Sequence, residues 1–173
     1  MKNFKIEAIV KNSMEGINIF IRDVNLNDNL IEKYVEGMII REKGFCDASW
    51  KLGGMITNCR YMILSNHMAD FRNYENGTNW GLFVGQKDSH FKVLNKFEYK
   101  GKIQILLLHL PDDESWKVFE NLDLENDEII DNSKQLFKKC CELPVINELA
   151  SDEWIKRCSF PLGLDDDGNL FDL

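Results

Sequence analysis

The 173-residue chain has only 3 prolines and no apolar run long enough for a transmembrane helix. No apolar segment follows its first residues, so we expect no secretory signal peptide. Internal repeats, low-complexity tracts and flexible linkers are also missing. These absences predict one domain spanning residues 1–173, a cytoplasmic location and no membrane partner.

Motifs for cofactors and metals are missing too. The glycines at 81 and 85 lack the lysine of a phosphate loop, and an EF-hand loop placed on Gly168 would put Gly163 at its first ligand position. The 5 cysteines form no C-x-x-C pair and are odd in number, which indicates reduced thiols. The 3 histidines are scattered, without paired cysteines. We therefore expect no metal and no cofactor.

Strand patterns dominate the first part of the chain and helical patterns the last. Alternating or apolar segments predict strands over residues 4–10, 17–23, 55–64, 80–84, 91–99 and 103–110. Helical spacing predicts helices over 28–42, after Pro111, over about 125–141 and from Ser151, with a loop over 45–54 and a tight turn over 164–170. This order predicts an α+β fold: a single domain with a mostly antiparallel sheet of about five to six strands, helices packed on one face, and a helical C-terminal part.

Charge is divided unevenly along the sequence. Residues 1–111 carry 15 Lys and Arg against 12 Asp and Glu, whereas residues 112–173 carry 6 against 17, so the net charges are +3 and −11. An acidic surface repels nucleic acid and attracts basic partners. No basic cluster is interleaved with aromatic residues, so direct binding of nucleic acid is not expected.

The acids of the last third fall in clusters that have aromatic residues close by. Such clusters are typical of an electrostatically steered protein interface. The sequence predicts contact with a basic partner through Asp112, Asp113, Glu114, Trp116, Glu120, Asp123, Glu125, Asp127, Glu128, Asp165, Asp166 and Asp167.

In size, acidity and lack of catalytic motifs, the chain resembles bacterial immunity proteins, which neutralise polymorphic or contact-dependent toxins. The resemblance covers the whole length and rests on no motif. It implies a non-catalytic antitoxin, a toxin inhibitor whose acidic surface blocks a basic partner such as a nuclease toxin domain.

Two other functions stay open at this point. A thiol-dependent enzyme would use Cys46, in the predicted loop, with His67 or His90 as its base. His109 lies in an apolar strand, where a buried core histidine is the simpler interpretation. A domain that binds a small ligand between sheet and helices is the third possibility.

Overall fold

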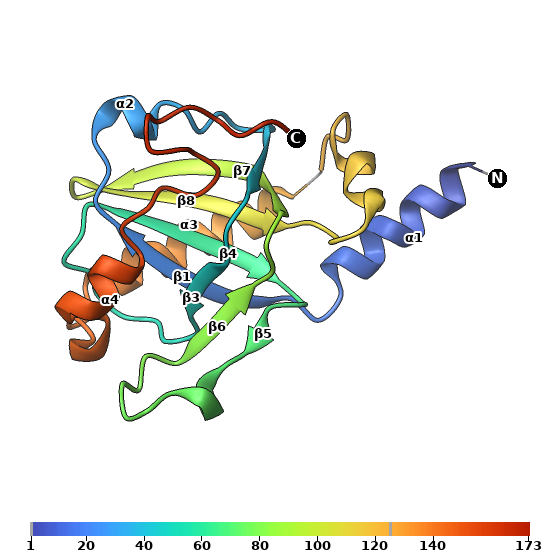
Figure 1. Cartoon of the computed structure of the whole chain (residues 1–173). Helices are drawn as coiled ribbons and strands as arrows, with labels where there is room; N and C mark the ends of the chain where they lie inside the picture. Colours follow the sequence, from blue (N-terminus) through green and yellow to red (C-terminus); the bar gives the residue numbers. More distant parts are fainter. Residues whose placement is uncertain (1, 125) are drawn as a thin grey trace.

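Eight strands form one sheet in the computed structural model, which describes residues 2–124 and 126–173 (Figure 1). The elements follow the chain in this order: α1 (Lys2–Met14), β1 (Asn18–Val24), α2 (Asp28–Ile31), β2 (Ile39–Glu42), β3 (Cys46–Ser49), β4 (Cys59–Ser65), β5 (Ala69–Asp70), η1 (Arg72–Tyr74), β6 (Leu82–Gly85), β7 (Ser89–Tyr99), β8 (Lys102–His109), η2 (Glu114–Phe119), α3 (Asp127–Cys141), η3 (Asn147–Ala150) and α4 (Asp152–Arg157). No helix of the described part is long and apolar enough to cross a membrane. The predicted α+β class is confirmed.

The strands lie side by side in the order β2-β7-β8-β4-β1-β3-β6-β5. Every pairing is antiparallel except that of β4 with β8, which run parallel at the centre. All seven residues of β4 are buried, as is typical of a strand covered on both faces. The sheet holds eight strands rather than five or six because the short strands β2, β3 and β5 lie outside the segments predicted as strands.

Alternation along β4 separates two layers of core. Tyr61 and Ile63 pack on one face with α2 and the C-terminal segment, whereas Met62 and Leu64 pack on the other with α1, η2 and α3. In Figure 1 the C-terminal segment, residues 158–173 (red), crosses in front of the sheet while α3 lies behind it. Segments from both ends of the sequence therefore enclose the central strands.

A buried ion pair joins the neighbouring strands β1 and β4. Arg60 and Asp23 are register partners, and the guanidinium binds the carboxylate with two bonds of 2.6 and 2.9 Å. Arg60 also donates to the carbonyl of Gly53 at 2.9 Å. Arg60 is 0% exposed and Asp23 is 5% exposed, so water cannot replace either partner.

We expect Asp23→Asn to lower the free energy of unfolding by about 3–5 kcal/mol, because it leaves a buried guanidinium without its counter-charge. Urea denaturation measures this change. Asp88→Asn is the matched control, since Asp88 pairs with Arg41 at an exposed position, and it should cost no more than about 1 kcal/mol. Equal effects of the two substitutions would contradict the assignment.

Two sequence predictions for the N-terminal part are wrong. Residues 4–10 belong to helix α1 rather than to a strand, because a short apolar run fits both periods and here packs its Ile9, Val10 and Met14 on the sheet. The predicted helix over 28–42 ends at Ile31. Gly37, at φ +87°, turns the chain, and its N–H donates to Val93 so that β2 can pair with β7.

Predictions for the C-terminal part agree better. α3 follows the expected stripe, and residues 164 and 170 form the bridge of a tight turn. The helix after Pro111 is a 3-10 helix. The predicted loop over 45–54 contains β3, which is held by strands on both of its edges rather than by a local pattern.

Candidate functional site

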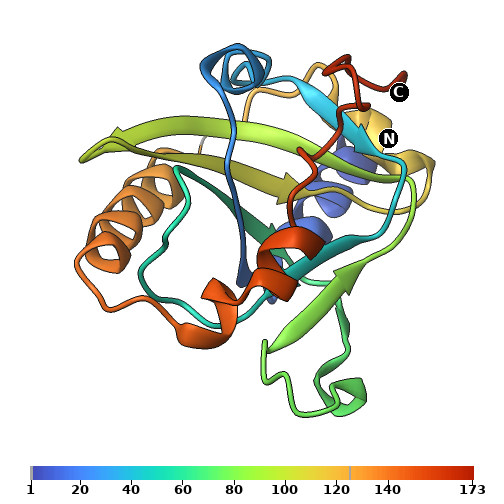
Figure 2. The same cartoon turned by 60° about the vertical axis from the view of Figure 1, so that its left-hand side comes forward.

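The sheet divides where β3 leaves β1. These strands share one register pair, Ile21 with Ser49, after which β3 continues with β6 and β5 as a smaller part of the sheet. Figure 2 shows β5 and β6 turned away from the long strands β7 and β8. We use the name fork cleft for the cavity beside the smaller part, lined by Phe45, Asp47, Phe71, Val84 and Arg157, together with Arg22 and Phe160. Arg22 adjoins the cavity through its hydrogen bond to the backbone of Asp47 and contacts the backbone of Phe160.

Arg22 lies on β1 and is joined to the fork cleft through the backbone of Asp47. It follows Phe20 and precedes Val24 on the same face of β1, among apolar neighbours of the core. Its Nη1 donates to the carbonyl of Asp47 on β3 at 3.0 Å, and its Nη2 to the carbonyl of Phe160 at 3.1 Å. The guanidinium of Arg22 thus links β1 to β3 at a point where the two strands no longer pair through their backbones.

The charge of Arg22 has no carboxylate partner among the described residues. The side chain is 4% exposed, forms no ion pair there, and its Nε has no hydrogen-bond acceptor. Guanidinium groups stay protonated in proteins, and buried charges are ordinarily paired. Arg22 is therefore a buried cation with capacity left for an anion.

The C-terminal segment contacts Arg22 through the carbonyl of Phe160. Ser159 and Phe160 are exposed, with Phe160 63% exposed, whereas Leu162 and Leu164 beyond them are anchored in the core. Tyr34 donates to the carbonyl of Leu162 at 2.7 Å. Ser159 and Phe160 are thus exposed, whereas the following part of the C-terminal segment is packed in the core.

Asp47 and Arg157 form the wall next to Arg22. The Nε of Arg157 donates to Oδ2 of Asp47 at 2.8 Å. A cavity of about 210 Å³ lies here, lined by Phe45, Asp47, Phe71, Val84 and Arg157. Phe45 is 59% exposed and Phe71 is 38% exposed, so flat apolar faces stand beside the charges.

A second hollow, of about 380 Å³, lies on the side of Trp50, Lys51 and Arg72. The guanidinium of Arg72 lies 5.1 Å from the ring centres of both Trp50 and Phe83. Its charge is also bound by Asp70, at 2.6 Å. This arrangement holds Arg72 against the aromatic faces.

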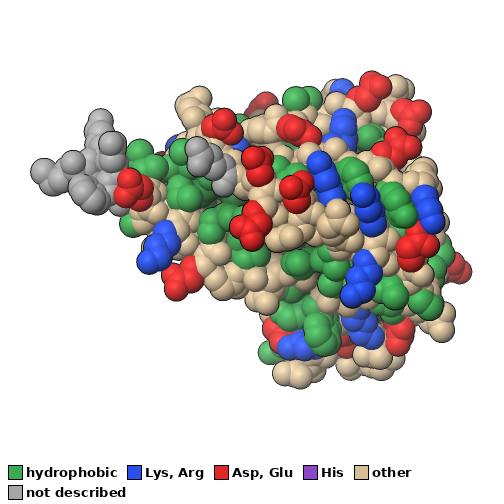
Figure 3. All heavy atoms as spheres, turned by 180° about the vertical axis from the view of Figure 1, so that it is seen from behind, with side chains coloured by type: hydrophobic (Ala, Val, Ile, Leu, Met, Phe, Trp, Pro, Cys, Tyr) green, Lys and Arg blue, Asp and Glu red, His purple; other side chains and the backbone are tan. Residues whose placement is uncertain are grey.

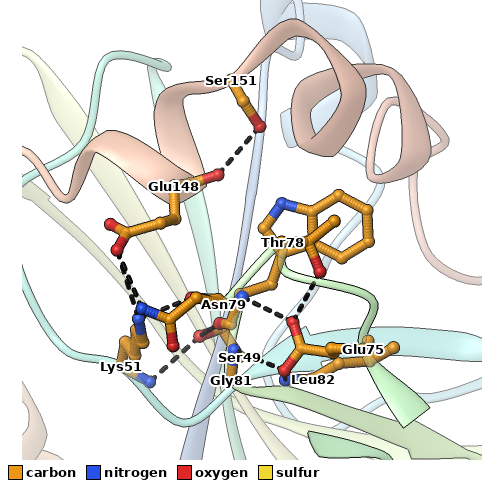
Figure 4. A network of polar contacts seen from close by, with 10 residues as sticks. Ser49, Lys51, Glu75, Thr78, Asn79, Gly81, Leu82, Glu148 and Ser151 are labelled. Carbon is orange, nitrogen blue, oxygen red and sulfur yellow. Dashed lines mark hydrogen bonds and ion pairs between the residues drawn. The ribbon is translucent and has the colours of Figure 1, made fainter.

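Glu75 organises the loop that leads into β6. Its carboxylate accepts from the backbone N–H groups of Trp80, Gly81 and Leu82 at 2.5, 3.1 and 3.2 Å, and from the hydroxyl of Thr78 at 3.0 Å (Figure 4). Gly81 has φ +69° and lies against the ring of Trp50, where a Cβ would come within 2.4 Å. Glu75 is thus committed to holding the loop.

Replacing Glu75 by Ala should destabilise this loop by about 1–3 kcal/mol, because charge-assisted bonds to three backbone donors are lost. Hydrogen exchange of the amides of Trp80, Gly81 and Leu82 measures the effect directly. The control is Glu98→Ala at an exposed position of β7. Unchanged exchange in the Glu75 variant would show that the carboxylate does not hold the loop.

The thiol mechanism predicted from Cys46 is wrong. Cys46 is 0% exposed, and burial raises the pKa of its thiol to about 12, so the nucleophilic thiolate is not formed at neutral pH. Within the described part of the chain, no hydrogen bond joins Cys46 to a histidine. His90 instead stacks on Trp116, at 4.0 Å between ring centres.

The predicted acidic contact residues lie on two sides of the sheet. Those of 112–128 surround η2 and the start of α3, on the face that carries α1, whereas Asp165, Asp166 and Asp167 lie in the turn of the C-terminal segment on the other face. Glu125 lies outside the described residues. Figure 3 shows acidic side chains of the rear face beside basic ones.

Several of these side chains already have partners within the chain. Asp113 accepts from the backbone N–H of Ser115, and Glu114 pairs with Lys117 at 3.0 Å. Trp116 is 8% exposed. Asp127 and Glu128 lie in the first turn of α3, where their negative charges interact favourably with the helix dipole. Partner contact through these positions stays a prediction that the structure does not test.

Comparison with solved structures identifies the fold. The chain is similar to the ADP-ribosyltransferase HopU1 of Pseudomonas syringae pv. Tomato DC3000, with a TM-score of 0.50, 13% identity and coverage of 54% of this chain and 46% of that one. It is also similar to the type III effector XopAI of Xanthomonas axonopodis pv. citri (TM-score 0.49, 12% identity, 54% and 41% covered) and to the Clostridium limosum C3 exoenzyme (TM-score 0.48, 12% identity, 62% and 68% covered). No protein-family model and no curated protein matches the sequence.

At such identities the likeness concerns the fold alone, and among these three structures only HopU1 reaches a TM-score of 0.50. The matches to HopU1 and XopAI span less than half of those chains. The likeness to HopU1 nevertheless overturns the resemblance to immunity proteins, because that neighbour is an ADP-ribosyltransferase. The expectations of a non-catalytic antitoxin and of a basic toxin partner are therefore wrong.

Arg22 was missed in the sequence. The signal was present: a single arginine occupies an inward position of an alternating strand, between Phe20 and Val24. An arginine at such a position is buried if the strand is covered, and a buried guanidinium needs an anion. The sequence pattern does not indicate whether that anion is a side chain of the protein or a bound ligand.

Proposed function

We propose that this chain is an enzyme of the ADP-ribosyltransferase type, whose fork cleft binds the diphosphate of a donor such as NAD. The observation that carries the proposal is the buried Arg22 guanidinium without a carboxylate partner. The fold likeness to HopU1 supports the same class of chemistry. The 5 free cysteines favour a reducing, cytoplasmic place of action.

The chemistry of the donor suits the residues of the cleft. A dinucleotide joins two nucleosides through an anionic diphosphate, so its site needs cations flanked by flat apolar faces. Arg22 and Arg157 supply planar guanidinium groups, which suit phosphate oxygens. Phe45 and Phe71 offer exposed rings for stacking. The phosphate would take the place of the Phe160 carbonyl on Arg22.

The same cleft contains a carboxylate for the bond-breaking step. When the bond between ribose C1′ and the nicotinamide nitrogen breaks, the nitrogen keeps the electron pair and positive charge develops on the sugar. Carboxylates stabilise such oxocarbenium-like states in glycoside hydrolysis. Asp47 lines the cavity and is bound there by one side chain, the half-exposed Arg157, whereas Glu75 is held by three backbone donors. We assign the stabilising role to Asp47.

Arg22→Gln and Arg157→Gln should each weaken NAD binding by about tenfold or more, because each removes a charge that pairs with phosphate. Calorimetric titration with NAD measures this loss, and thermal unfolding verifies that the variants fold. Arg157 has a side chain that is 42% exposed, so its variant tests the cleft without disturbing the core. Arg41→Gln, outside the cleft, is the control. If both cleft variants bind NAD as the unaltered chain does, the proposal is wrong.

Asp47→Asn should leave NAD binding within about threefold but lower the rate of NAD hydrolysis by about 10²–10³, the range found for losing one electrostatic group at a reacting centre. Release of nicotinamide measures the rate: water then forms the new bond to C1′ and loses a proton. Glu98→Gln controls for the loss of a surface charge. An unchanged hydrolysis rate in the Asp47 variant would remove this residue from the chemistry.

A further inference from the structure

A hollow larger than the fork cleft lies away from it. It has a volume of about 710 Å³ and lies among α1, the C-terminal ends of β4 and β8, and the start of η2. Its lining includes Ser13, Asn66, His67, Asp112 and Glu114. Tyr61 is the register partner of Arg22, and the hollow begins beyond Ser65, four residues further along β4. At about 3.3 Å per residue, that places it roughly 13 Å from Arg22.

Three potential metal ligands meet at one wall of this hollow. One ligand atom each of His67, His109 and Asp112 lie within 4.8 Å of one another. The Nε2 atoms of His67 and His109 lie 3.8 and 3.7 Å from Oδ1 of Asp112, too far for hydrogen bonds. The cluster arises because the parallel strands β4 and β8 end side by side.

His109 is the best-defined of the three. Its side chain is 0% exposed and stacks on Phe91, at 4.8 Å between ring centres. Its Nδ1 shares a hydrogen bond of 2.8 Å with the hydroxyl of Ser65. That hydroxyl also accepts the backbone N–H of His67. With the Nδ1 proton donated to Ser65, the lone pair of Nε2 points toward Asp112 and has no partner in the described chain.

His67 lies at the open side of the cluster. Its ring stacks on that of His109, with 3.9 Å between centres, and its side chain is 28% exposed. Nδ1 lies 2.9 Å from Oδ1 of Asn66, a partner that holds the ring as carboxamides and carboxylates hold metal-bound histidines. Nε2 lies 3.1 Å from the carbonyl of Leu110.

We propose that His67, His109 and Asp112 bind one divalent transition metal ion of the zinc type, with a further coordination position open to the hollow. Two imidazoles and one carboxylate suit zinc and its neighbours, whereas magnesium and calcium prefer oxygen ligands alone. Three protein ligands and an open position are the pattern of zinc sites that act on a water or substrate.

Binding requires the ring of His67 to reorient, because the ligand atoms of the three residues are spread over up to 4.8 Å and the two imidazole rings are stacked. Metal–ligand bonds of about 2.0–2.1 Å in a tetrahedron bring ligand atoms to roughly 3.3–3.4 Å from one another. The distances of 3.7 and 3.8 Å to Asp112 are therefore a few tenths of an ångström too long. His67 has to turn from its stack and exchange the carbonyl of Leu110 for the metal, which its partial exposure permits. His109 and Ser65 stay in place.

The test is a titration of the chelator-treated full chain with Zn²⁺, followed by calorimetry, and with Co²⁺, followed by absorption. We expect one equivalent to bind, with the visible bands of a four- or five-coordinate Co²⁺ site. A thiolate charge-transfer band should be absent, since the 5 cysteines are the competing ligands. His67→Ala and Asp112→Asn should each weaken binding by at least about tenfold.

The matched control is Asp165→Asn, which changes an acid of the C-terminal turn. This variant should bind Zn²⁺ as the unaltered chain does. His67 and Asp112 have side chains that are 28% and 33% exposed, so their variants do not depend on refilling the core. Absence of binding, a thiolate band, or unchanged affinity in both cluster variants would overturn the proposal.

Discussion

The burial of Arg22 between two diverging strands is the constraint on which the candidate site depends. β1 and β3 pair at one position only, and the guanidinium takes over where their ladder ends by donating to Asp47. Because it cannot lose its charge, the chain must keep acceptors around it. The carbonyls of Asp47 and Phe160 meet part of that need. An anionic ligand would meet it more fully, and this links the geometry of the sheet to its proposed chemistry.

Arg60 is a buried arginine whose charge is neutralised entirely within the protein. Arg60 precedes Tyr61, the register partner of Arg22, and points to the opposite face of β4. Its guanidinium donates two hydrogen bonds to the carboxylate of Asp23 and one to the carbonyl of Gly53. Every side-chain nitrogen of Arg60 has an acceptor, whereas the Nε of Arg22 has none among the residues that the structure describes. The contrast between two arginines of similar burial is the reason for reading Arg22 as part of a binding site rather than of the core.

Much of the fold could be predicted from local pattern. The long hairpin of β7 and β8, the amphipathic α3 and the terminal turn each carry a period or a turn signal within a few residues. The candidate site was harder to predict from the sequence. Cys46 was placed in a loop, but pairing of β3 on both edges buries it. His67 and His109 are 42 positions apart and meet only because β4 and β8 are neighbours in the sheet.

The sequence by itself determined the α+β class, the reduced state of the thiols and the positions of the central apolar strands, because composition and short-range periodicity control these properties. Tertiary structure alone decided which charges are neutralised, which histidines meet and where the sheet divides. Those features depend on strand order and on the path of the C-terminal segment over the sheet. Strand order is set by long-range burial, which no local stretch of residues encodes.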